Sequence, residues 1–180
     1  IPTTSGTGSE VSPVAVVADP DRFMKVGIAT RRIIAKWALV DPSLTVSCPP
    51  HVTAHSGMDA LSHAIESFCA RIPEDRSPRA IFVGKNPVSD SLAKQAIQLI
   101  ARSLPTAVSD PSNRQGREDM ALASLLAGMA FSNAGTAAVH ALQYPVGEAT
   151  HTSHGLGNAV LMPSVLKAIA KSRITELAFI

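Results

Sequence analysis

The sequence has few cysteines, no block of like charge and no long apolar run. Its two cysteines, Cys48 and Cys69, are too few for a disulfide framework and fit a reducing compartment, so a cytoplasmic location is expected. The 16 basic and 14 acidic residues are scattered along the chain, which argues against a nucleic-acid partner. No apolar run reaches the roughly 20 residues that cross a bilayer, and no signal-peptide pattern opens the chain, so no membrane partner is expected.

Hydrophobic residues make up 46% of the 180 residues, which is enough to bury a core. Neither end of the sequence looks like a natural boundary. The first residue, Ile1, leads at once into a Gly-rich turn, and residues 177–180 stop within an apolar, helix-like stretch. We therefore expect the central piece of a longer chain, truncated at both ends.

Strand-like patterns dominate the first quarter of the chain. Residues 11–18 are rich in Val and Ala and end at a turn signal at 19–21, which predicts a buried strand. The apolar run 37–40 predicts a second strand. After this quarter, apolar residues recur at helical spacing. The change indicates two domains, with residues 1–48 in the first and 49–180 in the second.

The second part is predicted to be mostly helical, with apolar stripes that are more typical of a core than of cofactor contacts. One helix begins near His51, and Ser89 is well placed to cap the next. The polar segment 147–157 is expected to be a loop before a last helix from about Asn158. The three stripes are Met58, Leu61, Ile65 and Phe68, then Ala93, Ile97, Ile100 and Leu104, then Leu122, Leu125, Leu126 and Met129.

The Gly-rich segment 3–10 precedes the first predicted strand. Small residues let a backbone approach a ligand closely, and hydroxyls and amides can donate to phosphate or ribose oxygens. The segment is not a dinucleotide fingerprint, because Val11 stands where the third glycine would be. It is not a P-loop either, because the Gly-Lys-Ser/Thr sequence is missing. By spacing alone, a tight turn is the simpler interpretation.

Asp59 and His63 stand four residues apart in a predicted helix, which places a carboxylate and an imidazole on one face. Such a pair alone is more often a surface pair. His140 and His154 strengthen the case for a metal, because both lie in apolar, Gly-rich sequence where an unpartnered imidazole is costly to bury. Three imidazoles and one carboxylate suit Fe(II) or Zn(II) rather than Mg(II) or Ca(II). His151 is a spare candidate, although a solvated loop residue is the simpler interpretation.

Four motifs, in this order along the chain, resemble the iron-containing (group III) alcohol dehydrogenases. They are Pro2-Thr3-Thr4-Ser5-Gly6-Thr7-Gly8-Ser9-Glu10, Gly57-Met58-Asp59-Ala60-Leu61-Ser62-His63-Ala64-Ile65-Glu66-Ser67, Gly128-Met129-Ala130-Phe131-Ser132-Asn133 followed by His140, and His154-Gly155-Leu156-Gly157-Asn158-Ala159. Because the motifs extend along nearly the whole chain, their combination is far more specific than any one of them.

The resemblance implies an α/β nucleotide-binding portion followed by an all-α metal-binding domain, the dehydroquinate synthase-like or iron alcohol dehydrogenase fold, with the active site in the cleft between them. It implies hydride transfer between a primary or secondary alcohol, or a hydroxyacid, and NAD or NADP, with a divalent metal polarising the alcohol oxygen. It also implies a homo-oligomer. The motif match assigns Asp59, His63, His140 and His154 to the metal, His140 and His154 to the catalytic centre, and Thr3, Thr4, Thr7, Ser12 and Lys25 to the cofactor.

Two features depart from the family pattern. Many relatives have a histidine four residues after the third metal ligand, where this chain has Tyr144, and the upstream Gly-Gly-Gly-Ser pyrophosphate motif is absent. Three alternatives remain open. One is a hydroxyacid-oxoacid transhydrogenase, whose insertion the stretch 71–90 resembles. Another is a metal-dependent lyase of the dehydroquinate synthase-like fold, against which the third histidine argues, and the last is a catalytically incompetent fragment.

Overall fold

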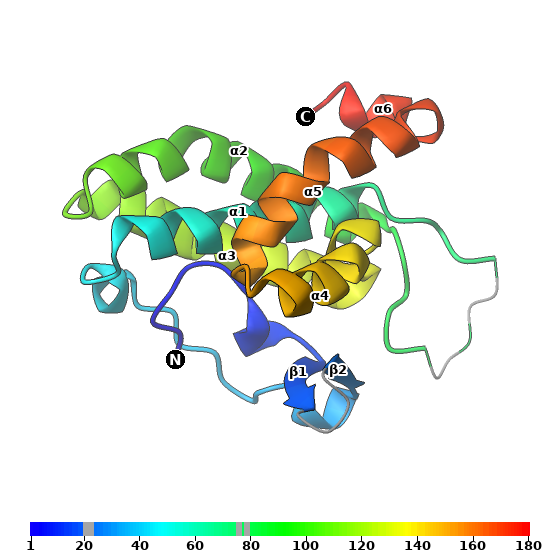
Figure 1. Ribbon diagram of the computed structural model, residues 1–180, viewed down its shortest axis with the longest axis horizontal. Coiled ribbons are helices and arrows are strands. Elements are labelled where there is room, and N and C mark those ends of the chain that lie inside the picture. Colours follow the sequence, from blue (N-terminus) through cyan, green and yellow to red (C-terminus); the bar gives the residue numbers. More distant parts are fainter. Residues whose placement is uncertain (20–23, 75–76, 78–79) are drawn as a thin grey trace.

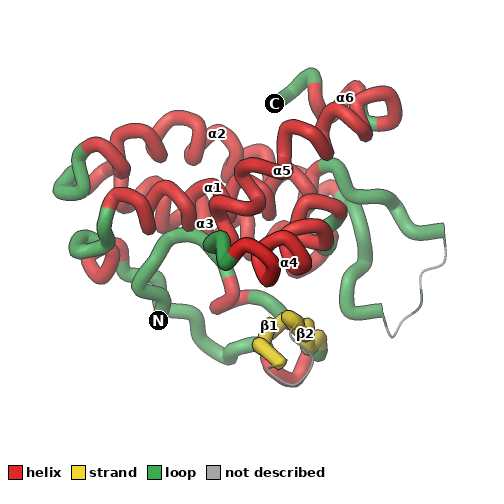
Figure 2. The backbone as a smooth tube through the Cα atoms, in the orientation of Figure 1, coloured by secondary structure: helices red, strands yellow, loops and turns green. Residues whose placement is uncertain are grey.

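The computed structural model describes residues 1–19, 24–74, 77 and 80–180. In this part of the chain, helices dominate and a small hairpin lies at one edge (Figure 1, Figure 2). The strands are β1 (Val14–Asp19) and β2 (Met24–Ala29), and the helices are α1 (Pro50–Phe68), α2 (Pro87–Ser109), α3 (Arg114–Ala134), α4 (Ala138–Thr150), α5 (His154–Ile169) and α6 (Ile174–Leu177). Short 3-10 turns cover Ser9–Val11, Arg31–Ile33, Pro42–Thr45 and Ala170–Ser172.

Helix α1 is the element around which the others are arranged. It packs against α2, α3 and α5, and it also contacts α4. Its residues Ala60, Ala64, Ile65 and Phe68 are buried in the core, which confirms the end of the stripe predicted for this helix. Because α4 and α5 both meet α1, residues far apart in the sequence come together beside it (Figure 1).

The buried face of α3 differs from the predicted stripe. Leu122 and Met129 are 47% and 39% exposed, whereas Ala123, Ala127 and Ala130 are fully buried. The distance between packed helices depends on the side chains at the contact, so alanines let α3 lie close to its neighbours while larger residues face outward. The pattern predicted the helix correctly, but its buried face only in part, since Leu126 of the stripe packs against the core and Leu122 and Met129 do not.

Residues 1–48 contain an antiparallel hairpin, in which β1 pairs with β2 from Val14↔Ala29 to Asp19↔Met24. The strand predicted at 11–18 is confirmed from Val14 onward, but its predicted burial is wrong. Val16 and Val17 are 45% and 46% exposed, because the two-stranded hairpin lies at one edge of the structure (Figure 1). The turn predicted at 19–21 lies mostly outside the described residues. The strand predicted at 37–40 is wrong: the sheet of the described residues has only β1 and β2, so this run has no ladder partner, and Trp37 is 85% exposed.

Two predicted helix boundaries also need correction. Asn86 caps α2, accepting hydrogen bonds from the amides of Val88 and Ser89, while the Ser89 hydroxyl accepts from the Asn86 amide and completes a capping box. The loop predicted at 147–157 is only three residues long, because α4 continues to Thr150 and α5 begins at His154. Residues 75–76 and 78–79 of the stretch 71–90 lie outside the described residues.

Within the described part of the chain, no helix by itself has the length and apolarity needed to cross a bilayer. The pair α3 and α4 meets those limits only when taken together, and it is bent by 105°. Much of α3 is buried against α1 and α2, as expected for a core helix.

Candidate metal centre

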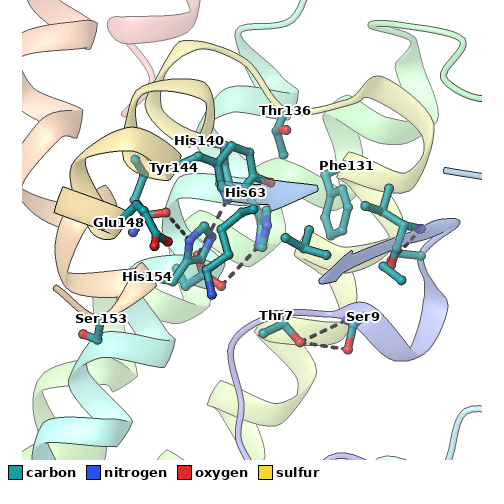
Figure 3. Close-up of a pocket in the computed structure, with 18 of the residues that line it drawn as sticks. Thr7, Ser9, His63, Phe131, Thr136, His140, Tyr144, Glu148, Ser153 and His154 are labelled. Atoms are coloured by element: carbon teal, nitrogen blue, oxygen red, sulfur yellow. Dashed lines mark hydrogen bonds and ion pairs between the residues drawn. The ribbon is translucent and has the colours of Figure 1, made fainter. Parts of the chain in front are cut away.

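Three buried side chains from two helices form a cluster that could hold one metal ion. Asp59 and His63 are one turn apart on α1, and His140 comes from the first turn of α4. One ligand atom from each lies within 4.8 Å of the others. His154, the first residue of α5, joins them, because its Nε2 lies 3.3 Å from Asp59 Oδ1 (Figure 3).

The close approach of α5 to α1 brings His154 into the cluster, and it depends on Gly155. A Cβ atom at Gly155 would overlap the carbonyl oxygen of His55 and lie 2.6 Å from its carbonyl carbon. Asn158 follows one turn later and is fully buried. The glycine therefore lets two polar side chains of α5 reach Asp59.

Two of the histidines direct Nε2 towards Asp59. His140 Nδ1 lies 2.6 Å from Glu66 Oε2, and His154 Nδ1 lies 2.6 Å from Gln143 Oε1. The Nε2 atoms lie 3.6 and 3.3 Å from Asp59 Oδ1, respectively. Since each Nδ1 is occupied by an acceptor, Nε2 is the nitrogen available to a metal on both rings.

Two buried side-chain atoms of the described residues have no hydrogen-bond partner: His63 Nδ1 and Asn158 Oδ1. The His63 ring is stacked between Phe131 and His140, with centroid separations of 4.3 and 4.4 Å. Leaving a polar atom buried and unpaired is costly, and a cation held among these side chains would offset that cost. The donor set of one carboxylate and three imidazoles fits a divalent iron or zinc ion.

The local electrostatics keep the carboxylate charged and His63 neutral. Burial opposes ionisation of Asp59, but attraction to His63, which is protonated at the low pH where Asp59 titrates, and the hydrogen bond with His140 outweigh it and lower the pKa of Asp59 to about 2. Burial lowers the pKa of His63 to about 4 and also lowers the pKa of His154. Burial works in the same direction on His140, but its bonds to Asp59 and Glu66 prevail and raise its pKa to about 9. An ionised carboxylate and a neutral imidazole are the forms that coordinate metals, so Asp59, His63 and His154 are in those forms at neutral pH, whereas His140 would release a proton when an ion binds.

A cavity of about 800 Å³ opens onto the cluster (Figure 3). Its volume lies in the range of small-molecule and cofactor sites. The Tyr144 ring, which lines this cavity, lies 6.0 Å from the His154 ring between centroids and is nearly parallel to it. Other lining residues come from the Gly-rich segment, the hairpin and aromatic side chains, namely Thr7, Ser12, Lys25, Phe82 and Phe131.

Comparison with known proteins identifies the family. The profile described as "Fe-containing alcohol dehydrogenase family, C-terminal" matches residues 53–179, and the profile described as "Iron-containing alcohol dehydrogenase" matches residues 1–42. The chain belongs to the iron-containing alcohol dehydrogenase family. It is 47% identical over 178 residues to long-chain-alcohol dehydrogenase 1 of Geobacillus thermodenitrificans, an alignment that covers 99% of this chain and 42% of the relative.

Two further similar proteins extend the comparison. The mitochondrial hydroxyacid-oxoacid transhydrogenase of Xenopus laevis is 42% identical over 153 residues, which cover 81% of this chain and 33% of the relative. The crystal structure of sulfoacetaldehyde reductase from Bifidobacterium kashiwanohense in complex with NAD+ superposes with a TM-score of 0.83 at 36% identity, covering 93% of this chain and 42% of that one. The chain thus spans about two-fifths or less of the length of these relatives.

The predicted cofactor contacts of this iron-containing dehydrogenase chain do not all reach the cavity. Thr7, Ser12 and Lys25 line it, whereas Thr3 and Thr4 are not among its lining residues. His151 also lines the cavity, at the end of α4.

Three side chains that hold the cluster were not predicted: Glu66, Gln143 and Asn158. Each lies on the same helix as a cluster residue and at helical spacing from it. Glu66 follows His63 by three positions, Gln143 follows His140 by three, and Asn158 follows His154 by four. A search for polar residues at these spacings would have found them, because such residues share a helix face.

Proposed function

We propose that the protein containing this chain is a metal-dependent alcohol dehydrogenase that transfers hydride between a primary or secondary alcohol and NAD or NADP. One observation carries the proposal: ligand atoms of Asp59, His63 and His140 lie within 4.8 Å of one another at the edge of a cavity of about 800 Å³. His154 completes the proposed ligand set. Fe(II) is the proposed metal, with Zn(II) as the alternative.

When bound, the ion would act as a Lewis acid towards the alcohol oxygen. The side chains around the ion would shape the cavity and bind the cofactor. Phe131 and Tyr144 line the cavity with aromatic rings, which offer an apolar surface to the substrate or the cofactor. Thr7, Ser12 and Lys25 offer hydroxyl and ammonium donors, which we assign to the cofactor. The NAD+ complex of the sulfoacetaldehyde reductase supports a nicotinamide cofactor.

The proposal extends to the organisation of the whole protein. We assign residues 1–48 to the end of an α/β nucleotide-binding domain and residues 49–180 to the start of the helical metal-binding domain. The helical character after Pro50 supports the second assignment. The two cysteines are free, which supports a reducing compartment such as the cytoplasm. A homo-oligomer is proposed from family resemblance.

The test uses the full-length protein, purified without oxygen, together with the variants His140→Ala and Arg114→Ala. Iron and zinc are quantified, and alcohol-dependent reduction of NAD+ and NADP+ is assayed. We expect about one metal per chain in a site of this kind, and His140→Ala should lose metal and turnover together. Arg114 is highly exposed on α3, so its variant should match the parent. Full turnover without metal would refute the proposal.

A transhydrogenase is the second candidate, because the Xenopus laevis transhydrogenase is 42% identical to this chain over 153 residues. Such an enzyme would pass hydride from a hydroxyacid to an oxoacid while the nicotinamide stays bound. The assay is hydride exchange between the two acids with no free nicotinamide added. Exchange without release of reduced cofactor would favour this candidate, whereas bound metal without either activity would favour a lyase.

A further inference from the structure

Glu66 is a buried carboxylate whose two oxygens both contact α4. It lies two turns along α1 from Asp59 and is 4% exposed. Its Oε1 accepts a hydrogen bond of 2.7 Å from the Val139 amide, and its Oε2 lies 2.6 Å from His140 Nδ1. One carboxylate therefore contacts two consecutive residues of another helix.

We propose that Glu66 is a positioning residue that fixes the ring of His140, keeping the proton on Nδ1 and turning Nε2 towards the metal centre. The proposal rests on the proposed function for its consequence, which is tight metal binding. An imidazole that donates Nδ1–H to a carboxylate is held in one ring orientation and becomes a more basic ligand through Nε2. The opposite edge of this ring already faces Asp59, since His140 Nε2 lies 3.6 Å from Asp59 Oδ1.

Glu66 also holds the start of α4, which sets the position of the His140 backbone. The residue that caps α4, Ala137, has no side-chain acceptor for the free amides of the first turn. Glu66 supplies this acceptor from α1, because its Oε1 accepts a hydrogen bond from the Val139 amide. A negative charge is favourable at a helix N-terminus, so the Glu66 carboxylate stabilises the N-terminus of α4 as well as the His140 ring.

The other histidines of the cluster are held differently. The acceptor at His154 Nδ1 is the neutral amide of Gln143, and 39% of the His154 side chain is exposed. His63 has no hydrogen bond at Nδ1 and is stacked on Phe131. Within the described residues, His140 is thus the cluster histidine whose Nδ1 lies within hydrogen-bonding distance of a carboxylate other than Asp59.

The variant Glu66→Gln is the sharpest test, because it keeps the shape of the side chain and removes one acceptor. A carboxylate accepts at both oxygens, whereas the amide of glutamine has one acceptor oxygen and one donor NH2 group. Both groups that face Glu66 are placed as donors, so the NH2 group must oppose either the Val139 amide or His140 Nδ1–H. Either His140 Nδ1–H loses its acceptor or the first turn of α4 loses its one.

The matched control is Asp119→Asn. Asp119 is also a buried carboxylate, but it lies on α3 and bonds to Ser103 and Arg102. Its loss disturbs the helical bundle without touching the metal cluster. It therefore separates the effect of weakened folding from the effect of a misplaced ligand.

The experiment measures zinc affinity of the full-length protein by competition with a chromophoric chelator, alongside its thermal midpoint. Glu66→Gln should bind zinc roughly 10- to 100-fold more weakly than the parent, as is typical when the hydrogen-bond acceptor of a metal-ligating histidine is lost. Asp119→Asn should bind zinc with unchanged affinity. Equal zinc affinity in the parent and Glu66→Gln would overturn the proposal.

A second measurement does not depend on metal or on the folding of a variant. In the metal-free parent labelled with 15N-histidine, the His140 Nδ1–H proton should give a downfield resonance that exchanges slowly with water. Rapid exchange of this proton in the parent would overturn the role of Glu66. If the parent binds no zinc or iron, the proposed function fails, and this resonance still decides whether Glu66 fixes the ring.

Discussion

Replacing Gly155 by alanine should separate α5 from α1 and weaken both the fold and the metal centre. The added Cβ would lie 2.6 Å from the carbonyl carbon of His55 and 3.3 Å from Asp59 Cβ. Carbon atoms in contact normally stay about 3.5 Å apart or more. The two helices must therefore move apart by about 1 Å, because the obstacle is backbone and cannot rotate away.

A movement of this size is large compared with the contacts that α5 makes. Asn158 Nδ2 donates to Asp59 Oδ1 over 2.8 Å, and a further 1 Å would break this buried bond. Overpacking costs about 1–3 kcal/mol, and the loss of a hydrogen bond to a charged group costs about 1.5–3 kcal/mol. Alanine has a higher helix propensity than glycine, which stabilises the helix by up to about 1 kcal/mol. We expect a net destabilisation of about 2–5 kcal/mol.

The assay compares urea unfolding and zinc content of Gly155→Ala with those of Gly116→Ala. Gly116 is also in the first turn of a helix, α3, but the nearest atoms to its added Cβ lie at 3.4 Å, an ordinary contact. The control should keep its metal and be as stable as the parent or up to about 1 kcal/mol more stable. If Gly155→Ala unfolds at the same urea concentration as the parent and keeps its zinc, the close approach of α5 does not hold the cluster together.

Two further predictions concern groups outside the metal centre. Burial opposes ionisation of Asp119, but hydrogen bonds from Ser103 and Arg102 prevail and lower its pKa. The ionised Asp119 therefore stabilises the fold above its unfolded pKa of about 3.9, and this stabilisation is lost as the pH falls through the lower pKa of the folded state. Asp119→Asn should therefore have a lower thermal midpoint than the parent at neutral pH, and the difference between the two midpoints should narrow below about pH 4. A difference that stays constant over that pH range would contradict the assignment. Burial raises the pKa of the Cys69 thiol to about 11, so iodoacetamide at mildly alkaline pH should alkylate Cys48 and spare Cys69 until the protein is unfolded, as read by mass spectrometry. Equal labelling of both thiols in the folded protein would show that Cys69 is not held in the core.

The sequence alone determined the kind of residues at the centre and the helices that carry them. Asp59 and His63 share a helix face by their spacing, and the period of the apolar residues marks α1 and α2. The ordered motifs led to the iron-containing alcohol dehydrogenase family, which the comparisons confirm. These features are local in sequence, so no knowledge of the tertiary arrangement was needed to find them.

The tertiary structure alone decided which residues meet and which faces are buried. The run at 37–40 has strand-like composition but no neighbouring strand, so it forms no ladder, and Trp37 and Leu39 stay exposed. Alanines form the most buried part of the contact face of α3, while Leu122 of the predicted stripe is exposed, because close helix packing favours small side chains there. Glu66 reaches His140 across 74 positions of the chain only because α1 and α4 pack together. Contacts of that kind depend on how helices cross, which the spacing within any one helix does not specify.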